Sequence, residues 1–273
     1  MLLTQAILPV AGLGTRFLPW TKVVPKELLP IGNQPIIALL VDECLSVGIT
    51  DVCFVINRGK EAIPQYFYDM PELEQELKKR GKSHMLEELA RYHNVNFHVV
   101  YQEVMLGDGH ALLQARDWVK GDHTAVLFGD DLIVGEQNGL QQLTGALKSL
   151  GDPMHAAMLC LQNVPRELTG KYGIVGVDGA WQKRARQQNI HKITELIEKP
   201  KPDKAPSTLG IVGKYLIPDQ PVQPVLRYQV HMTTEEPLQV ILQVEVRHAE
   251  VVPWHPHRQD VNITVWSGVT ARH

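Results

Sequence analysis

Short apolar runs alternate with longer segments of helical apolar spacing along the first 130 residues of the chain. The run Asp51–Asn57 is rich in β-branched residues, which is typical of a buried strand. The segment Pro35–Val47 opens with proline and meets Gly48, the usual signals for the start and end of a helix. Strands are predicted at Gln5–Val10, Asp51–Asn57, Asn96–Tyr101 and Thr124–Phe128, and helices at Pro35–Val47, Pro71–Tyr92 and Gly109–Val119.

Strands that are separated by helices imply right-handed βαβ crossovers. The predicted fold class is therefore α/β, with a Rossmann-like, doubly wound, mainly parallel mixed sheet. After about residue 151 the alternation loosens, and we expect a mixed extension of the same sheet within a single domain, 1–273. Strands are predicted there at His155–Leu161, Tyr172–Val177, His191–Lys199 and Leu209–Ile217, with the basic stretch Lys183–Arg186 as an exposed loop or helix face.

Composition narrows the class of protein. The 273 residues include 27 Lys and Arg against 30 Asp and Glu, so the net charge of -3 gives no electrostatic reason to expect nucleic-acid binding. No apolar run approaches the roughly 20 residues needed to cross a bilayer, and no secretory signal is visible. The three cysteines are scattered in apolar stretches, which indicates reduced core residues. We therefore expect a cytoplasmic enzyme or small-molecule binder.

A glycine-rich turn, residues 11–16 (AGLGTR), follows the first predicted strand, and Pro25-Lys26-Glu27 comes shortly after it. Such a turn exposes backbone N–H groups that can cradle phosphates, and Arg16 and Lys26 add positive charge. The GxG pattern alone favours a plain tight turn with two surface cations. A Rossmann dinucleotide site is a rival, but the third glycine of its GxGxxG pattern would fall at Phe17.

The acidic pair Asp130-Asp131 follows Gly129 at the end of the fourth predicted strand. The carboxyl ends of parallel strands share one edge of a sheet, so this pair is expected to face the glycine-rich turn. Carboxylates beside a phosphate site indicate Mg²⁺, which prefers oxygen ligands and substrate phosphates. The alternative for the motif in isolation is an Asp-Asp turn or a helix cap.

Two weaker motifs complete the candidate chemistry. Gln102 lies just before residues 106–111 (LGDGHA), where two glycines permit close approach of a ligand, and its amide suits the edge of a pyrimidine. Glu198-Lys199 could bind sugar hydroxyls and a phosphate together. The alternatives are an ordinary helix start for the first motif and a surface ion pair for the second.

Six segments of the chain are GLGTRFLPWTKVVPKELLPI, Gln102 with GDGHA, FGDDL, YGIV, LIEKPKP and TLGIVGKYL. In composition and order these segments resemble those of bacterial UTP–glucose-1-phosphate uridylyltransferases, which belong to the sugar-nucleotide pyrophosphorylases. The resemblance covers residues 5–217, and the related dTTP–glucose-1-phosphate enzymes share GxGTR, PK and EKP. The PKELLP stretch and the helical segment near residues 71–92 look more like the UTP-glucose branch.

The resemblance implies a nucleotide-diphospho-sugar transferase fold that forms UDP-glucose and pyrophosphate from UTP and glucose 1-phosphate. About 1–150 would be the nucleotide-binding half and about 151–273 the sugar-binding half. The implied catalytic residues are Arg16 and Lys26 at the triphosphate, Asp130 on Mg²⁺ and Lys199 at the sugar phosphate. The implied substrate-binding residues are Ala11, Gly12 and Gly14 at the nucleotide, Gln102 and Gly107 at the uracil, Tyr172, Gly173 and Glu198 at the sugar, and Glu27, Val212 and Gly213.

The resemblance weakens in the last part of the chain. The family has a late aspartate, in a D-C-G-like motif, that helps to hold the metal, and Asp260 falls near that position without the glycine. Residues 219–273 therefore form an atypical C-terminus, and the open alternatives are a catalytically weakened nucleotide-binding relative or an enzyme for dTTP or another sugar 1-phosphate. A homodimer or homotetramer is expected from the family, with no nucleic-acid or membrane partner.

Overall fold

The computed structural model describes residues 3–150, 157–180, 190–218, 241–245 and 250–251. Asp260 and the basic stretch Lys183–Arg186 lie outside the described residues. None of the helices in the described part is long and apolar enough to cross a membrane.

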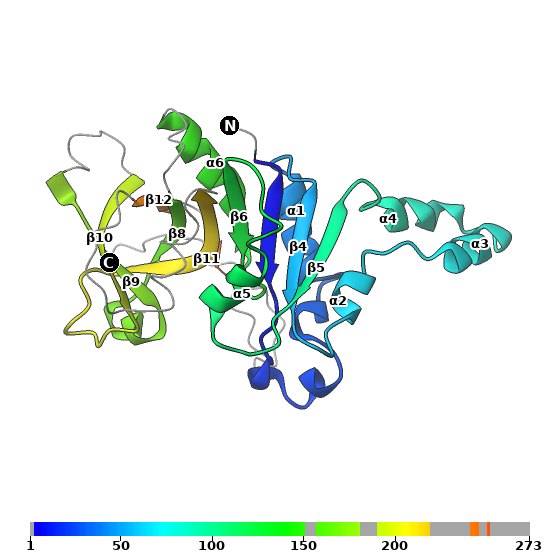
Figure 1. Ribbon diagram of the computed structural model, residues 1–273, viewed down its shortest axis with the longest axis horizontal. Coiled ribbons are helices and arrows are strands. Elements are labelled where there is room, and N and C mark those ends of the chain that lie inside the picture. Colours follow the sequence, from blue (N-terminus) through cyan, green and yellow to red (C-terminus); the bar gives the residue numbers. More distant parts are fainter. Residues whose placement is uncertain (1–2, 151–156, 181–189, 219–240, 246–249, 252–273) are drawn as a thin grey trace, which may run out of the picture.

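A nine-stranded sheet runs through the molecule in the order β5-β4-β1-β6-β11-β8-β12-β10-β9 (Figure 1). The first four strands in this order pair in parallel and come from the first half of the chain. They are β1 (Gln5–Pro9), β4 (Asp51–Ile56), β5 (Asn96–Tyr101) and β6 (His123–Leu127).

The strands of the second half extend this sheet beyond β6. The strand β11 runs antiparallel to both β6 and β8, whereas β12 is parallel to β8. The mixed, mainly parallel α/β sheet predicted from the sequence is thereby confirmed. These strands are β8 (Ala157–Asn163), β9 (Gly173–Val177), β10 (Ile190–Glu198), β11 (Leu209–Pro218) and β12 (Ile241–Glu245).

Helices cover both faces of the parallel strands because successive side chains of a strand point to opposite faces. Leu8 and Phe54 pack on one face, in a cluster that includes α1 and α6 residues. Ile7, Cys53 and Val55 pack on the other face, against α5. The helices of the body are α1 (Ile36–Leu45), α2 (Ala62–Gln65), α5 (Asp108–Gln114) and α6 (Gly139–Ser149).

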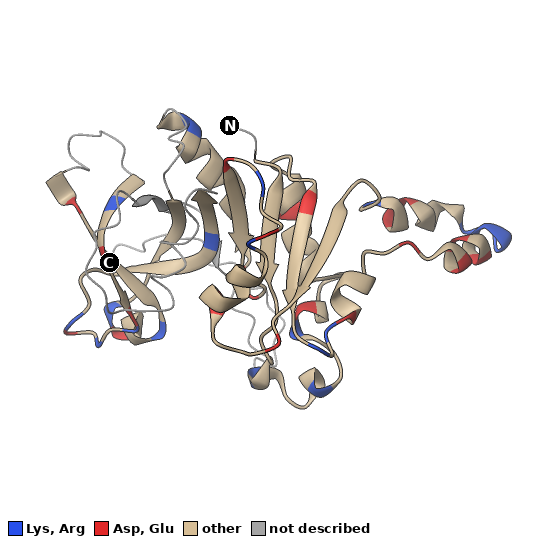
Figure 2. Ribbon diagram, viewed as in Figure 1, with Lys and Arg blue, Asp and Glu red and all other residues tan. Residues whose placement is uncertain are grey.

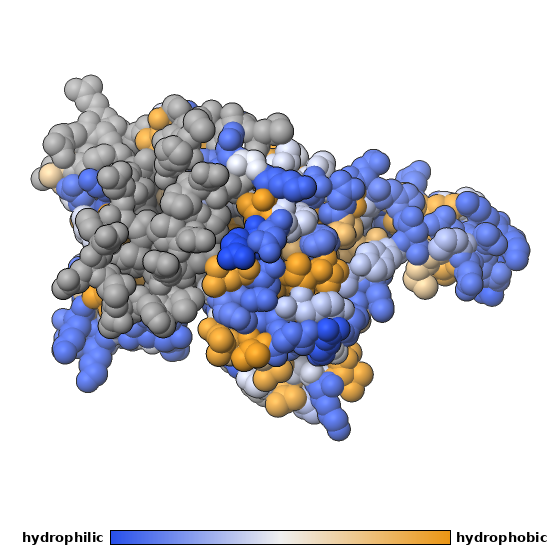
Figure 3. Space-filling model, viewed as in Figure 1, coloured by the Kyte–Doolittle hydropathy of each residue, from blue (hydrophilic) through white to orange (hydrophobic). Residues whose placement is uncertain are grey.

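An arm, residues 71–92, stands away from the β5 edge of the sheet (Figure 1). One continuous helix was expected here, but the structure has α3 (Pro71–Lys79) and α4 (Leu86–Ala90) instead. The chain breaks where Gly81 adopts a left-handed φ of 70°, a conformation that ends a helix. The arm carries many charged residues, which leave its surface largely hydrophilic (Figures 2 and 3).

Short elements connect the main ones. The short strands are β2 (Pro30–Ile31), β3 (Gln34–Pro35), β7 (Ile133–Val134) and β13 (Glu250–Val251). The 3-10 turns are η1 (Thr15–Phe17), η2 (Trp20–Lys22), η3 (Lys26–Leu28), η4 (Ser83–Met85) and η5 (Arg166–Lys171). The first three of these turns lie in the loop that follows β1, which is where the candidate site begins.

Candidate active site

Three charged side chains meet at the carboxyl ends of β1 and β6. These strands are parallel neighbours, so the turns that follow them lie on the same edge of the sheet. The Nζ atom of Lys26 lies 2.9 Å from Oδ2 of Asp130, and Nη2 of Arg16 lies 3.5 Å from the same oxygen. The structure therefore brings together the glycine-rich turn, the Pro-Lys-Glu segment and the acidic pair.

The glycine-rich turn has a fixed shape and an open face. Gly14 has a left-handed φ of 64°, and an added Cβ would lie 3.1 Å from Thr21 Cγ2 and 3.3 Å from Lys26 Cβ. The hydroxyl of Thr21 donates a hydrogen bond to the Gly14 carbonyl at 2.8 Å. No atom lies within 4 Å of an added Cβ at Gly12, so a ligand can approach the backbone there. These features suit a phosphate-binding turn.

Asp130 is held as a carboxylate. Burial raises its pKa, but the charge and hydrogen bond of Lys26, together with Arg16, outweigh burial and leave the pKa below its usual value. The carboxylate oxygens of Asp130 are hard metal ligands, and they lie next to two cationic side chains that can bind phosphate. Within the described residues, no group of three or more His, Cys, Asp or Glu side chains is arranged to hold a metal ion.

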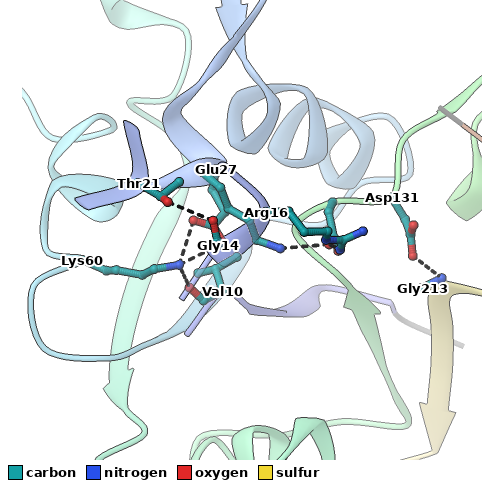
Figure 4. A network of polar contacts seen from close by, with 10 residues as sticks. Val10, Gly14, Arg16, Thr21, Glu27, Lys60, Asp131 and Gly213 are labelled. Atoms are coloured by element: carbon teal, nitrogen blue, oxygen red, sulfur yellow. Dashed lines mark hydrogen bonds and ion pairs between the residues drawn. The ribbon is translucent and has the colours of Figure 1, made fainter. Parts of the chain in front are cut away.

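Asp131 has a different role from its neighbour. Its Oδ2 accepts a hydrogen bond of 2.8 Å from the backbone N–H of Gly213, and it points away from Arg16 (Figure 4). An added Cβ at Gly213 would overlap this oxygen and lie 2.7 Å from Phe128 Cβ. Asp131 therefore ties the end of β6 to β11. The side chain of Val212 is buried in the core, so only its backbone is available to a ligand.

The Gln102 segment is organised by its own hydrogen bonds. The amide nitrogen of the buried Gln102 donates to the Gly107 carbonyl at 3.0 Å and lies 3.1 Å from Nδ1 of His110. Gly107 has a φ of 95°, which favours glycine. Because the amide nitrogen is committed to the loop, a contact between Gln102 and a base would use its oxygen.

The residues expected at the sugar lie at the outer strands. Glu198 pairs with Gly173 across β10 and β9, and an added Cβ at Gly173 would lie 3.2 Å from Glu198 Oε2. The backbone N–H of Lys199 donates to the Tyr172 carbonyl at 3.0 Å, and its ammonium lies 3.0 Å from Glu198 Oε1. Gly173 thus leaves room for the Glu198 carboxylate.

Asp108, at the start of α5, connects the two halves of the site electrostatically. Its pKa is raised by burial and then by the charge of Asp130. Glu198 raises it further, whereas Lys26 and Lys199 lower it. Charged groups from both halves of the sheet therefore lie close enough to act on a single carboxylate. Asp108 belongs to the LGDGHA motif, but only the glycines of that motif, and not this carboxylate, were given a role from the sequence.

Residues 5–245 match the model of the nucleotidyl transferase family. This chain belongs to that family. Two UTP–glucose-1-phosphate uridylyltransferases of Bacillus subtilis strain 168 are 37% and 39% identical to it over 214 residues, which are 78% of this chain and 69% and 70% of theirs. A UTP-bound UDP-glucose pyrophosphorylase from Acinetobacter baumannii has a TM-score of 0.79 and 30% identity, over 92% of this chain and 88% of that one.

The position of Glu27 corrects the role expected for it in this nucleotidyltransferase. Its side chain is fully buried, and its carboxylate lies 2.9 Å and 3.0 Å from the ammonium of Lys60. The carboxylate therefore supports the site from within and is not exposed to a substrate. Lys60 also donates to the Val10 carbonyl at 2.7 Å, and Asn57 donates to the Ala11 carbonyl at 2.7 Å.

Lys60 and Asn57 were not among the predicted site residues. Both follow β4, the parallel neighbour of β1, and this position at a strand's carboxyl end is the signal that could have identified them. The predicted metal ligand Asp260 lies outside the described residues. Its role in the nucleotidyltransferase stays a prediction.

Proposed function

We propose that this nucleotidyltransferase transfers UMP from UTP to glucose 1-phosphate, forming UDP-glucose and pyrophosphate. The observation that carries the proposal is the cluster of Lys26, Arg16 and Asp130 beside an open glycine-rich turn. This arrangement suits a triphosphate, and Glu198 and Lys199 supply groups for a sugar phosphate. The relatives named as UTP–glucose-1-phosphate uridylyltransferases support the choice of nucleotide and sugar.

In the proposed reaction, a phosphate oxygen of glucose 1-phosphate attacks the α-phosphorus of UTP in line. A new P–O bond forms, the bond from the α-phosphorus to the bridging oxygen breaks, and pyrophosphate leaves with the electron pair. The nucleophile is already an anion near neutral pH, so no strong general base is needed. The protein has to hold two anions together and neutralise charge, which Lys26, Arg16 and Lys199 would do.

The residues present fit Mg²⁺. Asp130 offers carboxylate oxygens at the edge of the phosphate site, and Mg²⁺ is commonly bound by one or two carboxylates plus substrate phosphates. The low pKa of Asp130 keeps these oxygens ionised at neutral pH. Asp130 would hold the ion, and a bound Mg²⁺ would supply neutralisation of phosphate charge. Asp260 is the second proposed ligand.

The test combines two measurements on the wild-type protein. The first is an assay of pyrophosphate release with UTP, glucose 1-phosphate and Mg²⁺. Sugar-dependent release of pyrophosphate is the expected result. A calorimetric titration with UTP alone measures binding of the nucleotide separately. Binding of UTP without pyrophosphate release would contradict the proposed catalysis and support the nucleotide-binding alternative.

We also propose that the enzyme is cytoplasmic and forms a homodimer or homotetramer. The buried, unpaired state of Cys44, Cys53 and Cys160 supports a reducing compartment. The assembly follows from the family resemblance alone. Light scattering coupled to size exclusion measures it, and a monomeric mass at micromolar concentration would contradict it.

A further inference from the structure

A buried ion pair lies directly behind the phosphate site. The side chain of Glu27 has no exposed surface and that of Lys60 is only 9% exposed. The ammonium of Lys60 contacts three oxygens, at 2.7 Å to the Val10 carbonyl and at 2.9 Å and 3.0 Å to Glu27. An ammonium has three hydrogens to donate, so these contacts use its full hydrogen-bonding capacity.

We propose that Lys60 is a positioning residue for nucleotidyl transfer. Its ammonium fixes the segments that carry the phosphate site, and the inference rests on the function proposed above. Lys60 approaches Val10 and Glu27 from one side, whereas Arg16 and Asp131 lie on the other (Figure 4). Lys60 therefore acts through other residues and does not itself reach the site.

The first link runs from Lys60 to the glycine-rich turn. Val10 is the last residue before the turn, and its carbonyl is the acceptor of the Lys60 ammonium. The next carbonyl, of Ala11, accepts from Asn57, which lies three residues before Lys60. Two side chains from the segment after β4 thus fix two successive peptide groups at the entrance to the turn. The direction of the N–H groups beyond them depends on these bonds.

The second link runs through Glu27 to the two charged residues of the site. Glu27 is held inward by Lys60, and Lys26, which precedes it in the turn η3, extends to Asp130 at 2.9 Å. Glu27 also packs on Gly129, where an added Cβ would lie 3.1 Å from Glu27 Cγ and 2.8 Å from Val10 Cγ1. The Lys60–Glu27 pair therefore contacts Val10, which precedes the glycine-rich turn, and Gly129, which precedes Asp130. One member of the pair, Glu27, is also the residue that follows Lys26.

A contribution to folding stability does not by itself explain the buried Lys60–Glu27 pair. Burial raises the pKa of Glu27 and lowers the pKa of Lys60, so both groups carry a desolvation cost when charged. Replacement of a buried ion pair by apolar groups of similar volume is often neutral or stabilising. A role in geometry explains why the pair lies where three segments of the site converge.

A second buried pair provides a matched control. Nζ of Lys214 lies 3.0 Å from Oε2 of Glu43, and their side chains are 0% and 3% exposed. Glu43 accepts a hydrogen bond from the backbone N–H of Leu140, at the start of α6. This pair joins α1, α6 and β11 and contacts neither Val10 nor Lys26.

The experiment compares charge-neutral double variants of the two pairs. The variant Glu27→Gln/Lys60→Met removes both charges of the pair, so neither is left buried without its partner. It also removes the ammonium that donates a hydrogen bond to the Val10 carbonyl. We expect kcat/KM for pyrophosphate release with UTP and glucose 1-phosphate to fall between about ten- and a hundredfold, as for a small displacement of reacting groups. Glu43→Gln/Lys214→Met is expected to stay within about threefold of the wild type, because its side chains hold the start of α6 rather than the glycine-rich turn or Lys26.

Thermal unfolding and hydrogen exchange separate positioning from stability. The single variant Lys60→Met should unfold at a lower temperature, because it leaves Glu27 buried without its partner, and the double variant should recover most of the loss. Amide exchange in residues 11–16 should remain faster in the double variant than in the wild type. Recovery of wild-type kcat/KM together with wild-type exchange in this segment would overturn the proposal.

The two proposals fail in different ways. If the wild type releases no pyrophosphate with UTP and glucose 1-phosphate, the proposed function is wrong. The exchange measurement still decides the role of Lys60, since it needs no substrate. Faster exchange in residues 11–16 of the double variant, but not of the Glu43→Gln/Lys214→Met control, supports positioning. Equal exchange in both refutes it.

Discussion

Replacement of Lys26 by alanine should lower kcat/KM for pyrophosphate release by at least about a hundredfold. The ammonium lies 2.9 Å from Asp130 and the Lys26 side chain is only 16% exposed, so it acts in a partly desolvated site. Two unit charges about 4 Å apart attract by about 4 kcal/mol at an effective dielectric constant of about 20. Loss of one preorganised donor to a developing charge costs about 3–4 kcal/mol, which agrees with this figure.

The same change should cost little stability. Asp130 is 39% exposed and keeps Arg16 at 3.5 Å, so the Lys26–Asp130 pair contributes less than about 1 kcal/mol to folding. The assay is continuous detection of pyrophosphate, with urea unfolding measured in parallel. Lys22→Ala is the control, because Lys22 is an exposed lysine of the same loop. Turnover of Lys26→Ala near the wild-type level would show that the Lys26 ammonium does not stabilise the transition state.

Three further predictions concern the metal, the rim and the thiols. Asp130→Asn should abolish Mg²⁺-dependent turnover but leave the unfolding midpoint nearly unchanged; a Mg²⁺ titration of activity checks this, and unaltered metal dependence contradicts it. Gly213→Ala should lower the free energy of unfolding in urea by about 1–3 kcal/mol, because the added Cβ would overlap Asp131 and Phe128. The control Gly145→Ala, at an open position of α6, should raise the free energy of unfolding by up to about 1 kcal/mol. Burial raises the pKa of Cys53 to about 12, and all three buried thiols should react with Ellman's reagent only after unfolding; fast reaction of the native protein contradicts this.

Hydrophobic patterning predicted eight of the nine strands of the described sheet but not β12 (Ile241–Glu245). Strands such as Asp51–Ile56 are buried on both faces, so their apolar runs are continuous and their ends are marked by polar residues. The arm was predicted less well, because its charged residues satisfy helical spacing throughout and give no reason for a break. The left-handed conformation of Gly81 divides it, and one glycine in a helical pattern is an ambiguous signal.

The charged cluster of the site was predictable from the topology of the sheet. Lys26, Arg16 and Asp130 belong to segments that follow neighbouring parallel strands, and parallel strands end at one edge. The inward direction of Glu27 was not predictable, because a Pro-Lys-Glu segment carries no mark of which side chain faces the core. Its partner Lys60 lies 33 residues away, and a pairing at that distance becomes visible only in three dimensions.

We propose that groups from both halves of one sheet together carry out uridylyl transfer to glucose 1-phosphate. The most direct measurement is phosphorus NMR of the wild-type enzyme mixed with UTP, glucose 1-phosphate and Mg²⁺. We predict that the diphosphate signals of UDP-glucose and the signal of pyrophosphate grow in equal amounts and only when the sugar phosphate is present. Absence of UDP-glucose, or cleavage of UTP at the same rate without glucose 1-phosphate, would contradict it.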